Sequence, residues 1–199
     1  GGQAPAALPP RSGATDDEPA SRVRRVPRAK ARGRAGQLLV AAKTTAPAAK
    51  AADPTITVVA AGLAPTDGLD PSAENDLLFL EGMYAAGAKG TFDAMGVMVY
   101  GLGQSPDIRH VGLRFPINFS RPVLTRDVMV RNGDGATPIW ATGYAWMAVP
   151  DDWTGRPSTW GESVTEEQQA QYVVRGLERM RAEWPWMGVV FIWAFRFVE

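Results

Sequence analysis

Four apolar segments recur along most of the chain and are separated by polar stretches. They cover residues 55–63 (TITVVAAGL), 92–100 (FDAMGVMVY), 138–146 (PIWATGYAW) and 187–197 (MGVVFIWAFRF). These runs are continuous rather than alternating, which predicts strands that are buried on both faces, as in a parallel sheet.

Helical patterns lie between these segments. Ser72 is a candidate cap for a helix that closes at Gly87, and Ser120 with Pro122 predicts a second helix that ends at Asn132. Residues 165–168 read Thr-Glu-Glu-Gln, a capping box, and the apolar stripe that follows is Val173, Leu177, Met180 and Trp184. Residues 37–52 are rich in alanine and predict a further helix, although Pro47 is expected to kink or break it. The order predicts an α/β fold of parallel βα units joined by right-handed crossovers.

Composition sets broad limits on the class of protein. The chain has 199 residues, of which 45% are hydrophobic, so it can bury one sizeable core. No apolar run approaches the 18 or so residues of a membrane span, so no membrane association is expected. There is no cysteine and one histidine, His110, so neither a metal site nor a cofactor is predicted, and the compartment stays undetermined.

Residues 1–36 differ from the rest of the chain. They carry eight Lys and Arg against three acidic residues and consist mostly of Ala, Gly, Pro and Arg. Such a segment cannot bury enough apolar surface to offset its ordering entropy, so disorder is expected. No aromatic residue is interleaved with the basic ones, so binding of nucleic acid is not expected.

Several segments together resemble one enzyme family. They include AADPTITVVAAGLAPT, YAAGAKGTFDAMGVMVYG, TPIWATGYAW and the stretch from residue 165 to residue 197. In this order they resemble the cellulase- and xylosidase-type glycoside hydrolases of the large clan of retaining (β/α)8 barrels. The resemblance covers residues 37–199 and implies strands five to eight, which is half of such a barrel.

The resemblance also implies where catalysis would occur. Retaining enzymes of this kind use two carboxylates at the C-terminal ends of the strands. The nucleophile position corresponds to Gly143, and no Asn-Glu dipeptide supplies the acid/base. Other strand-end positions that are polar in the family are apolar here: Met98, Val99, Ala145 and Ala194. The remaining catalytic candidates are Asp151, Asp152 and Glu162, for which solvation of a loop is the alternative.

Aromatic residues gather in the C-terminal part of the chain and suggest platforms for stacking on sugar rings. The candidate ligand-binding residues are Tyr100, Tyr144, Trp146, Trp153, Trp160 and Trp193. Burial in the core is the competing interpretation for these aromatics, and it is preferred for Trp140, Trp184 and Trp186.

Three functions therefore stay open. The chain could be a glycosidase acting on β-linked saccharides, a non-catalytic scaffold that binds a carbohydrate or another small molecule (a natural pseudoenzyme), or an engineered barrel fragment. Half a barrel also leaves two open sheet edges, which tend to associate. Pairing into a homodimer is the first expectation, ahead of a different partner or a flattened sheet covered by residues 1–36.

Overall fold

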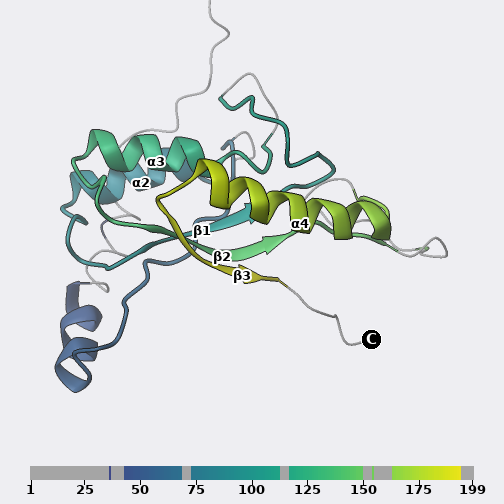
Figure 1. Cartoon of the computed structure of the whole chain (residues 1–199). Helices are drawn as coiled ribbons and strands as arrows, with labels where there is room; N and C mark the ends of the chain where they lie inside the picture. The colour runs from purple at the N-terminus through teal and green to yellow at the C-terminus, as the bar shows by residue number, and fades with distance from the viewer. Residues whose placement is uncertain are drawn as a thin grey trace, which may run out of the picture.

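The computed structural model describes residue 36, residues 43–68, 73–112 and 117–149, residue 154 and residues 163–193. Helices and strands alternate within these residues (Figure 1). The elements are α2 (Asp76–Ala85), β1 (Met95–Tyr100), α3 (Pro122–Arg131), β2 (Ile139–Ala145), α4 (Glu166–Glu183) and β3 (Met187–Ile192). The basic segment 1–35 and residues 194–199 lie outside the described residues.

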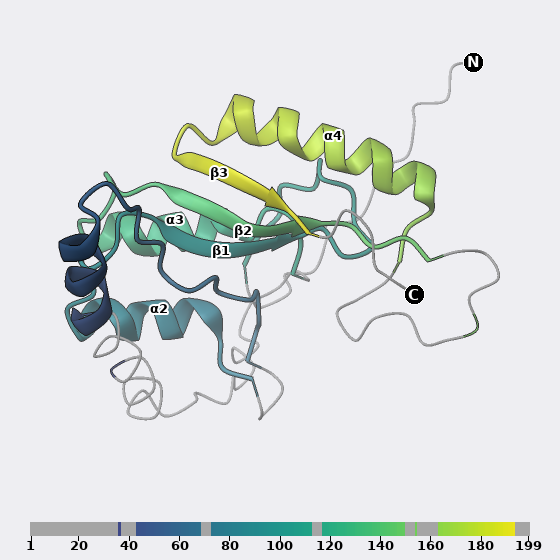
Figure 2. The same ribbon diagram turned by 90° about the horizontal axis from the view of Figure 1, so that it is seen from below.

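The three strands form one parallel sheet in the order β1-β2-β3, which confirms the predicted α/β class with parallel strands. Helices α2, α3 and α4 all lie on the same side of this sheet (Figure 1). Figure 2 views the sheet from below, and none of these three helices lies in front of the strands there. Residues 43–52 are helical through Pro47, so the expected break does not occur, and this helix lies near the N-terminal end of β1.

The predicted strand 55–63 is only partly formed. Residues 58–63 run parallel to β1 and contact it through two isolated bridges, Val59 to Ala94 and Leu63 to Val97. Before them, the Asp53 side chain accepts a bond from the backbone N–H of Thr55 at 2.8 Å, which makes a turn in place of extended chain. The segment 58–63 is therefore an irregular fourth strand beside β1.

Local hydrogen bonding explains where the helices begin and end. Asn75, rather than Ser72, caps α2, since its side chain accepts from the N–H groups of residues 77 and 78. Both α2 and α3 end with a glycine of positive φ, Gly87 at 91° and Gly133 at 72°, in Schellman-type turns. At α4 the predicted capping box between Thr165 and Gln168 is confirmed.

A stack of four aromatic rings lies in the core between the sheet and α4. Phe119 stacks on Trp146 with centroids 5.5 Å apart and on Trp184 at 5.0 Å. Trp184 in turn stacks on Trp186 at 5.3 Å. Such offset pairs contribute about 0.5–1.5 kcal/mol each beyond the burial of their surface. We call these four residues the aromatic stack.

Arg179 of α4 joins the aromatic stack to the connection that follows β1. Its guanidinium lies 5.4 Å from the Phe119 ring centroid and donates to the backbone oxygens of Pro106 and Ile108 and to Ser120 Oγ. Its Nε donates to Glu183 Oε2 at 2.9 Å. Because Arg179 is only 5% exposed, these acceptors compensate a charge that would otherwise be costly to bury. Ser120 thus serves as an acceptor and donor in this cluster and not as a helix cap.

Two tyrosine hydroxyls donate hydrogen bonds inside the core. Tyr84 donates to Asp134 Oδ2 at 2.7 Å, and Tyr144 donates to the backbone oxygen of Val173 at 2.6 Å. Burial raises the pKa of Tyr84 above its ordinary 10.0, and the neighbouring Asp134 carboxylate raises it further. Burial also raises the pKa of Tyr144.

Removal of the central ring of the aromatic stack should destabilise the protein strongly. We expect Phe119→Ala to lower the free energy of unfolding by about 3–5 kcal/mol, because the cavity has three aromatic neighbours that cannot collapse into it. Val130→Ala, at a 54% exposed position on α3, is the control and should change it by less than about 0.5 kcal/mol. Urea unfolding of both variants measures this. A loss below about 1 kcal/mol for Phe119→Ala would contradict the stack's central role.

Tyr84 and Tyr144 should stay protonated at about pH 11, where a free tyrosine is mostly ionised. Since their folded-state pKa lies above the unfolded value of 10.0, their contribution to stability is complete below that pH and is lost as the pH rises beyond it. Tyrosinate absorbance during alkaline titration measures this directly. The Tyr144→Phe variant should give an unchanged native titration up to about pH 11 and a smaller rise on unfolding. A smaller native signal in that variant would show that Tyr144 ionises in the folded state.

Candidate functional site

The C-terminal ends of the strands form the candidate functional end of the molecule. The connections that leave these ends are the long ones, residues 64–75, 101–121 and 146–165, whereas those at the opposite end are 86–94, 132–138 and 184–186. In parallel α/β sheets, ligands bind outside the carboxyl ends of the strands. This end of the sheet is therefore where the sequence-predicted site residues are expected to meet.

A bulge in β2 determines which side chains reach this end. Val97 of β1 is opposite Ala141, but the next residue, Met98, is opposite Gly143, so Thr142 is an extra residue in β2. Because strand side chains alternate between the two faces of the sheet, the extra residue moves every later side chain of β2 to the opposite face from the one it would otherwise have. Tyr144 and Trp146 therefore point to the helix side of the sheet.

Tyr144 and Trp146 belong to the core and not to a ligand-accessible surface, which corrects their assignment from sequence. They are 0% and 1% exposed. The Trp146 Nε1 donates to the backbone oxygen of Gln104 at 2.7 Å, and its ring stacks on Phe119. Neither ring offers a face to a ligand in this arrangement.

Tyr100 lies at the C-terminal end of β1 and differs from these two residues. Its hydroxyl lies 2.9 Å from the point that a Cβ atom on Gly143 would occupy. The side chain is half-buried, and within the part of the chain that the structure describes its hydroxyl has no hydrogen-bond partner. Burial raises the pKa of Tyr100, and the protonated hydroxyl can donate one hydrogen bond and accept another.

Trp193 follows the last residue of β3 and is 59% exposed. Its backbone N–H donates to the backbone oxygen of Tyr144 at 3.0 Å, which places Trp193 beside the end of β2. Alternation from the core-facing Val190 puts Phe191 and Trp193 on the face opposite the helices, and Phe191 lies 6.3 Å from the half-buried ring of Trp140. Sequence patterns did not single out Phe191, and they favoured a core position for Trp140.

We call the side of the sheet away from α2, α3 and α4 the open face. Its polar content is small. Thr142 Oγ1 donates to the backbone oxygen of Val97 at 3.1 Å, and a Cβ on Gly62 would lie 2.2 Å from that same Oγ1, so a side chain at residue 62 would have to displace Thr142. The side chains assigned to the open face are Met98, Tyr100, Trp140, Thr142, Phe191 and Trp193.

The other strand-end residues singled out from the sequence have different environments. Val99 is 1% exposed and belongs to the core, and Ala145, half-buried, is opposite Tyr100. The catalytic candidates Asp151, Asp152 and Glu162 lie outside the described residues, as do Trp153, Trp160 and Ala194.

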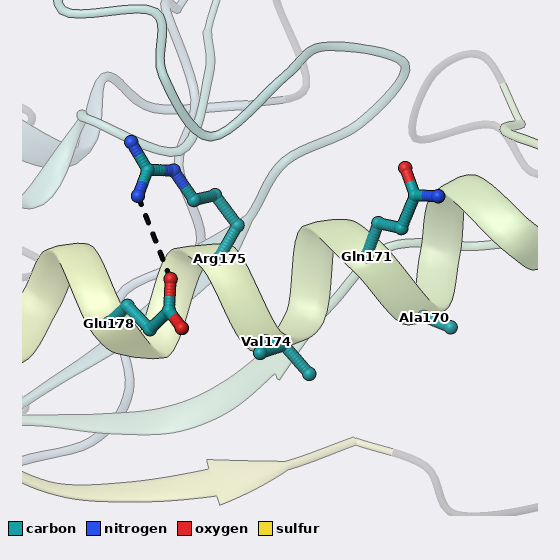
Figure 3. A pocket seen from close by; sticks show the side chains of 5 residues that line it. All are labelled: Ala170, Gln171, Val174, Arg175 and Glu178. Atoms are coloured by element: carbon teal, nitrogen blue, oxygen red, sulfur yellow. Dashed lines mark ion pairs between the residues drawn. The ribbon is translucent and has the colours of Figure 1, made fainter.

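Two surface hollows lie away from the strand ends. One, of about 460 Å³, follows the outer surface of α4, where Ala170, Val174 and Glu178 belong to its lining (Figure 3). There Arg175 pairs with Glu178 at 3.6 Å and with Asp107 at 3.1 Å, so the charges are already compensated. The second, of about 330 Å³, lies between the helix 43–52 and residues 90–93, where Lys50 pairs with Asp93 at 2.8 Å.

Within the residues that the structure describes, no group of three or more His, Cys, Asp or Glu side chains is close enough to hold a metal ion. No helix in that part of the chain has the length and apolar character needed to cross a membrane. His110 is exposed, and its backbone oxygen accepts from Asn118 Nδ2 at 2.8 Å.

Comparison with known proteins adds no family assignment. No protein-family model matches the chain, and no curated protein matches it significantly.

Proposed function

We propose that the chain is a non-catalytic ligand-binding scaffold built on half of a (β/α)8 barrel, akin to glycosidases that cleave β-linked saccharides. The ligand is a carbohydrate or another small molecule with an apolar face. It binds at the C-terminal ends of β1, β2 and β3, between Tyr100 and Trp193. The carrying observation is the Tyr100 hydroxyl, which faces Gly143 and has no partner among the described residues.

The winding of the chain supports the half-barrel. The strands are adjacent in the same order as in the sequence, and α2, α3 and α4 lie on one side of the sheet (Figure 1). In a doubly wound sheet the strand order reverses and helices cover both faces. A barrel keeps one direction and places its helices outside, so the open face corresponds to the barrel interior.

The spacing of the two aromatic residues supports a ligand of the size of a sugar ring. Tyr100 is opposite Ala145 in β2, and Tyr144 is opposite Ile192 in β3. Tyr100 and Trp193 therefore lie on either side of Ala145, at the same end of the sheet. Strands lie about 4.8 Å apart, which puts the two backbones about 10 Å apart across β2. A planar ring at one side and a hydroxyl donor at the other suit a molecule with one apolar face and a polar rim.

A binding role is preferred to hydrolysis because of what Gly143 lacks. Retaining glycosidases need a nucleophilic carboxylate beside the general acid. Gly143 has no side chain, and Met98, which is paired with it in β1, is apolar. The hydrolase stays the second candidate through Asp151, Asp152 and Glu162, which follow β2 in the sequence.

Binding should depend on both aromatic residues. With cello- and xylo-oligosaccharides as probes, we expect a ligand-induced change in tryptophan fluorescence that Trp193→Ala abolishes. Tyr100→Phe should weaken binding about fivefold, the effect of losing one hydrogen bond worth about 1 kcal/mol. Tyr172→Phe, a tyrosine on the helix side of the sheet, is the matched control and should bind normally. Equal binding by the wild type and both test variants would exclude this site.

Purified protein should not hydrolyse aryl β-glucosides or β-xylosides above the rate of a blank. The matched variant carries Asp151→Asn, Asp152→Asn and Glu162→Gln, and it should behave as the wild type does. We expect this because neither wild type nor variant places a carboxylate at Gly143. Release of the chromophore by the wild type that disappears in the triple variant would establish the hydrolase instead.

A further inference from the structure

Exposed large hydrophobic side chains are concentrated at one edge of the sheet, along β3. Among the described residues, four of the eight lie at the β3 edge: Val189, Phe191, Ile192 and Trp193, which are 40–59% exposed. A fifth, Ile56, is 43% exposed and precedes the segment 58–63 at the other edge. The other three, Leu78, Val130 and Val174, lie singly on α2, α3 and α4. Scattered residues are ordinary, whereas a contiguous group marks a contact surface.

Neither edge carries the features that keep exposed strands apart. Residues 55–63 and 187–193 contain no charged residue and no proline. Natural edge strands usually carry lysine, proline or inward-pointing charges, which prevent pairing with another chain. Within the described residues, β3 pairs only with β2, and the segment 58–63 pairs only with β1, so each has one side without a backbone partner.

We propose that a second copy of this chain occupies both edges, with β3 of each copy running parallel to the segment 58–63 of the other. The two edges suit one another because both are apolar and uncharged and belong to one parallel sheet. A two-fold axis then satisfies both edges of both copies at once. Antiparallel pairing of β3 with β3 would need a two-fold axis perpendicular to the strands instead, and it would leave both 58–63 edges open.

The count of strands favours this arrangement. Each copy supplies β1, β2, β3 and the segment 58–63, all parallel, so two copies supply the eight strands of a closed barrel. The open face then becomes the interior, where Trp140, Phe191 and Met98 pack against their counterparts. This inference concerns assembly and goes beyond ligand binding, since the strand-end site of one copy is complete without the other.

Solution mass tests the interface first. In sedimentation velocity over micromolar concentrations, the full chain should sediment at twice the mass of one chain. Val189→Lys places a charge on the β3 edge and should shift the protein to a monomer. Val174→Lys, on the outer surface of α4 at a 57% exposed position, is the matched control and should stay dimeric. A wild-type monomer at all concentrations, or equal behaviour of the two lysine variants, would overturn the proposal.

Disulfide trapping tests which edges meet, and it does not depend on the lysine variants folding. The chain has no cysteine, so an introduced thiol has no background. Ala61→Cys and Val189→Cys are made as separate proteins, and each should stay uncrosslinked alone under mild oxidation. Mixed, they should form a covalent dimer, because each interface contains one residue 61 and one residue 189. Crosslinking of Val189→Cys alone would show a β3–β3 pair and overturn the arrangement, as would no crosslink in the mixture.

Discussion

The hydrogen bonds of the buried Arg179 guanidinium are the interactions on which the packing around α4 depends. A buried cation is stable only when its donors are satisfied, and here the acceptors come from residues 106, 108 and 120, all in the connection after β1. Since Arg179 belongs to α4, one side chain holds this connection against the last helix. The Phe119 ring, carried by the same connection, is thereby placed between Trp146 and Trp184. The connection is consequently held on the helix side of the sheet.

The bulge at Thr142 provides the other half of that arrangement. Without the extra residue, Tyr144 and Trp146 would point away from α4, and the aromatic stack would lose its first ring. The same irregularity turns Gly143 toward Tyr100, where a side chain would collide with the hydroxyl. Packing of the core and the space at the strand ends therefore have one common cause, and a change in the register of β2 would alter both.

Sequence patterns predicted the parts of the fold that depend on local chemistry. The capping box at Thr165 and the glycine ends of α2 and α3 were found because their hydrogen bonds join residues a few positions apart. Contacts between residues far apart in the sequence were not predicted. The Asp93 carboxylate, for example, accepts a hydrogen bond from the Val58 N–H at 2.8 Å, which interrupts the predicted strand 55–63. At the site, Tyr100 and Trp193 were identified as aromatic strand-end residues. Tyr144 and Trp146 were misassigned, because a one-residue bulge in an apolar run leaves no trace in its composition.

The composition of the strands constrains what can cover the open face. A sheet with one face in water alternates apolar and polar residues, whereas these strands are apolar at nearly every position. Met98, Trp140 and Phe191 on the open face are as apolar as Val97, Ile139 and Val190 on the helix side. The strands thus have the composition of a sheet covered on both sides, and the covering surface must itself be apolar. Among the described residues assigned to this face, Tyr100 and Thr142 carry hydroxyls, and Tyr100 lies at the strand ends, where the proposed ligand would bind.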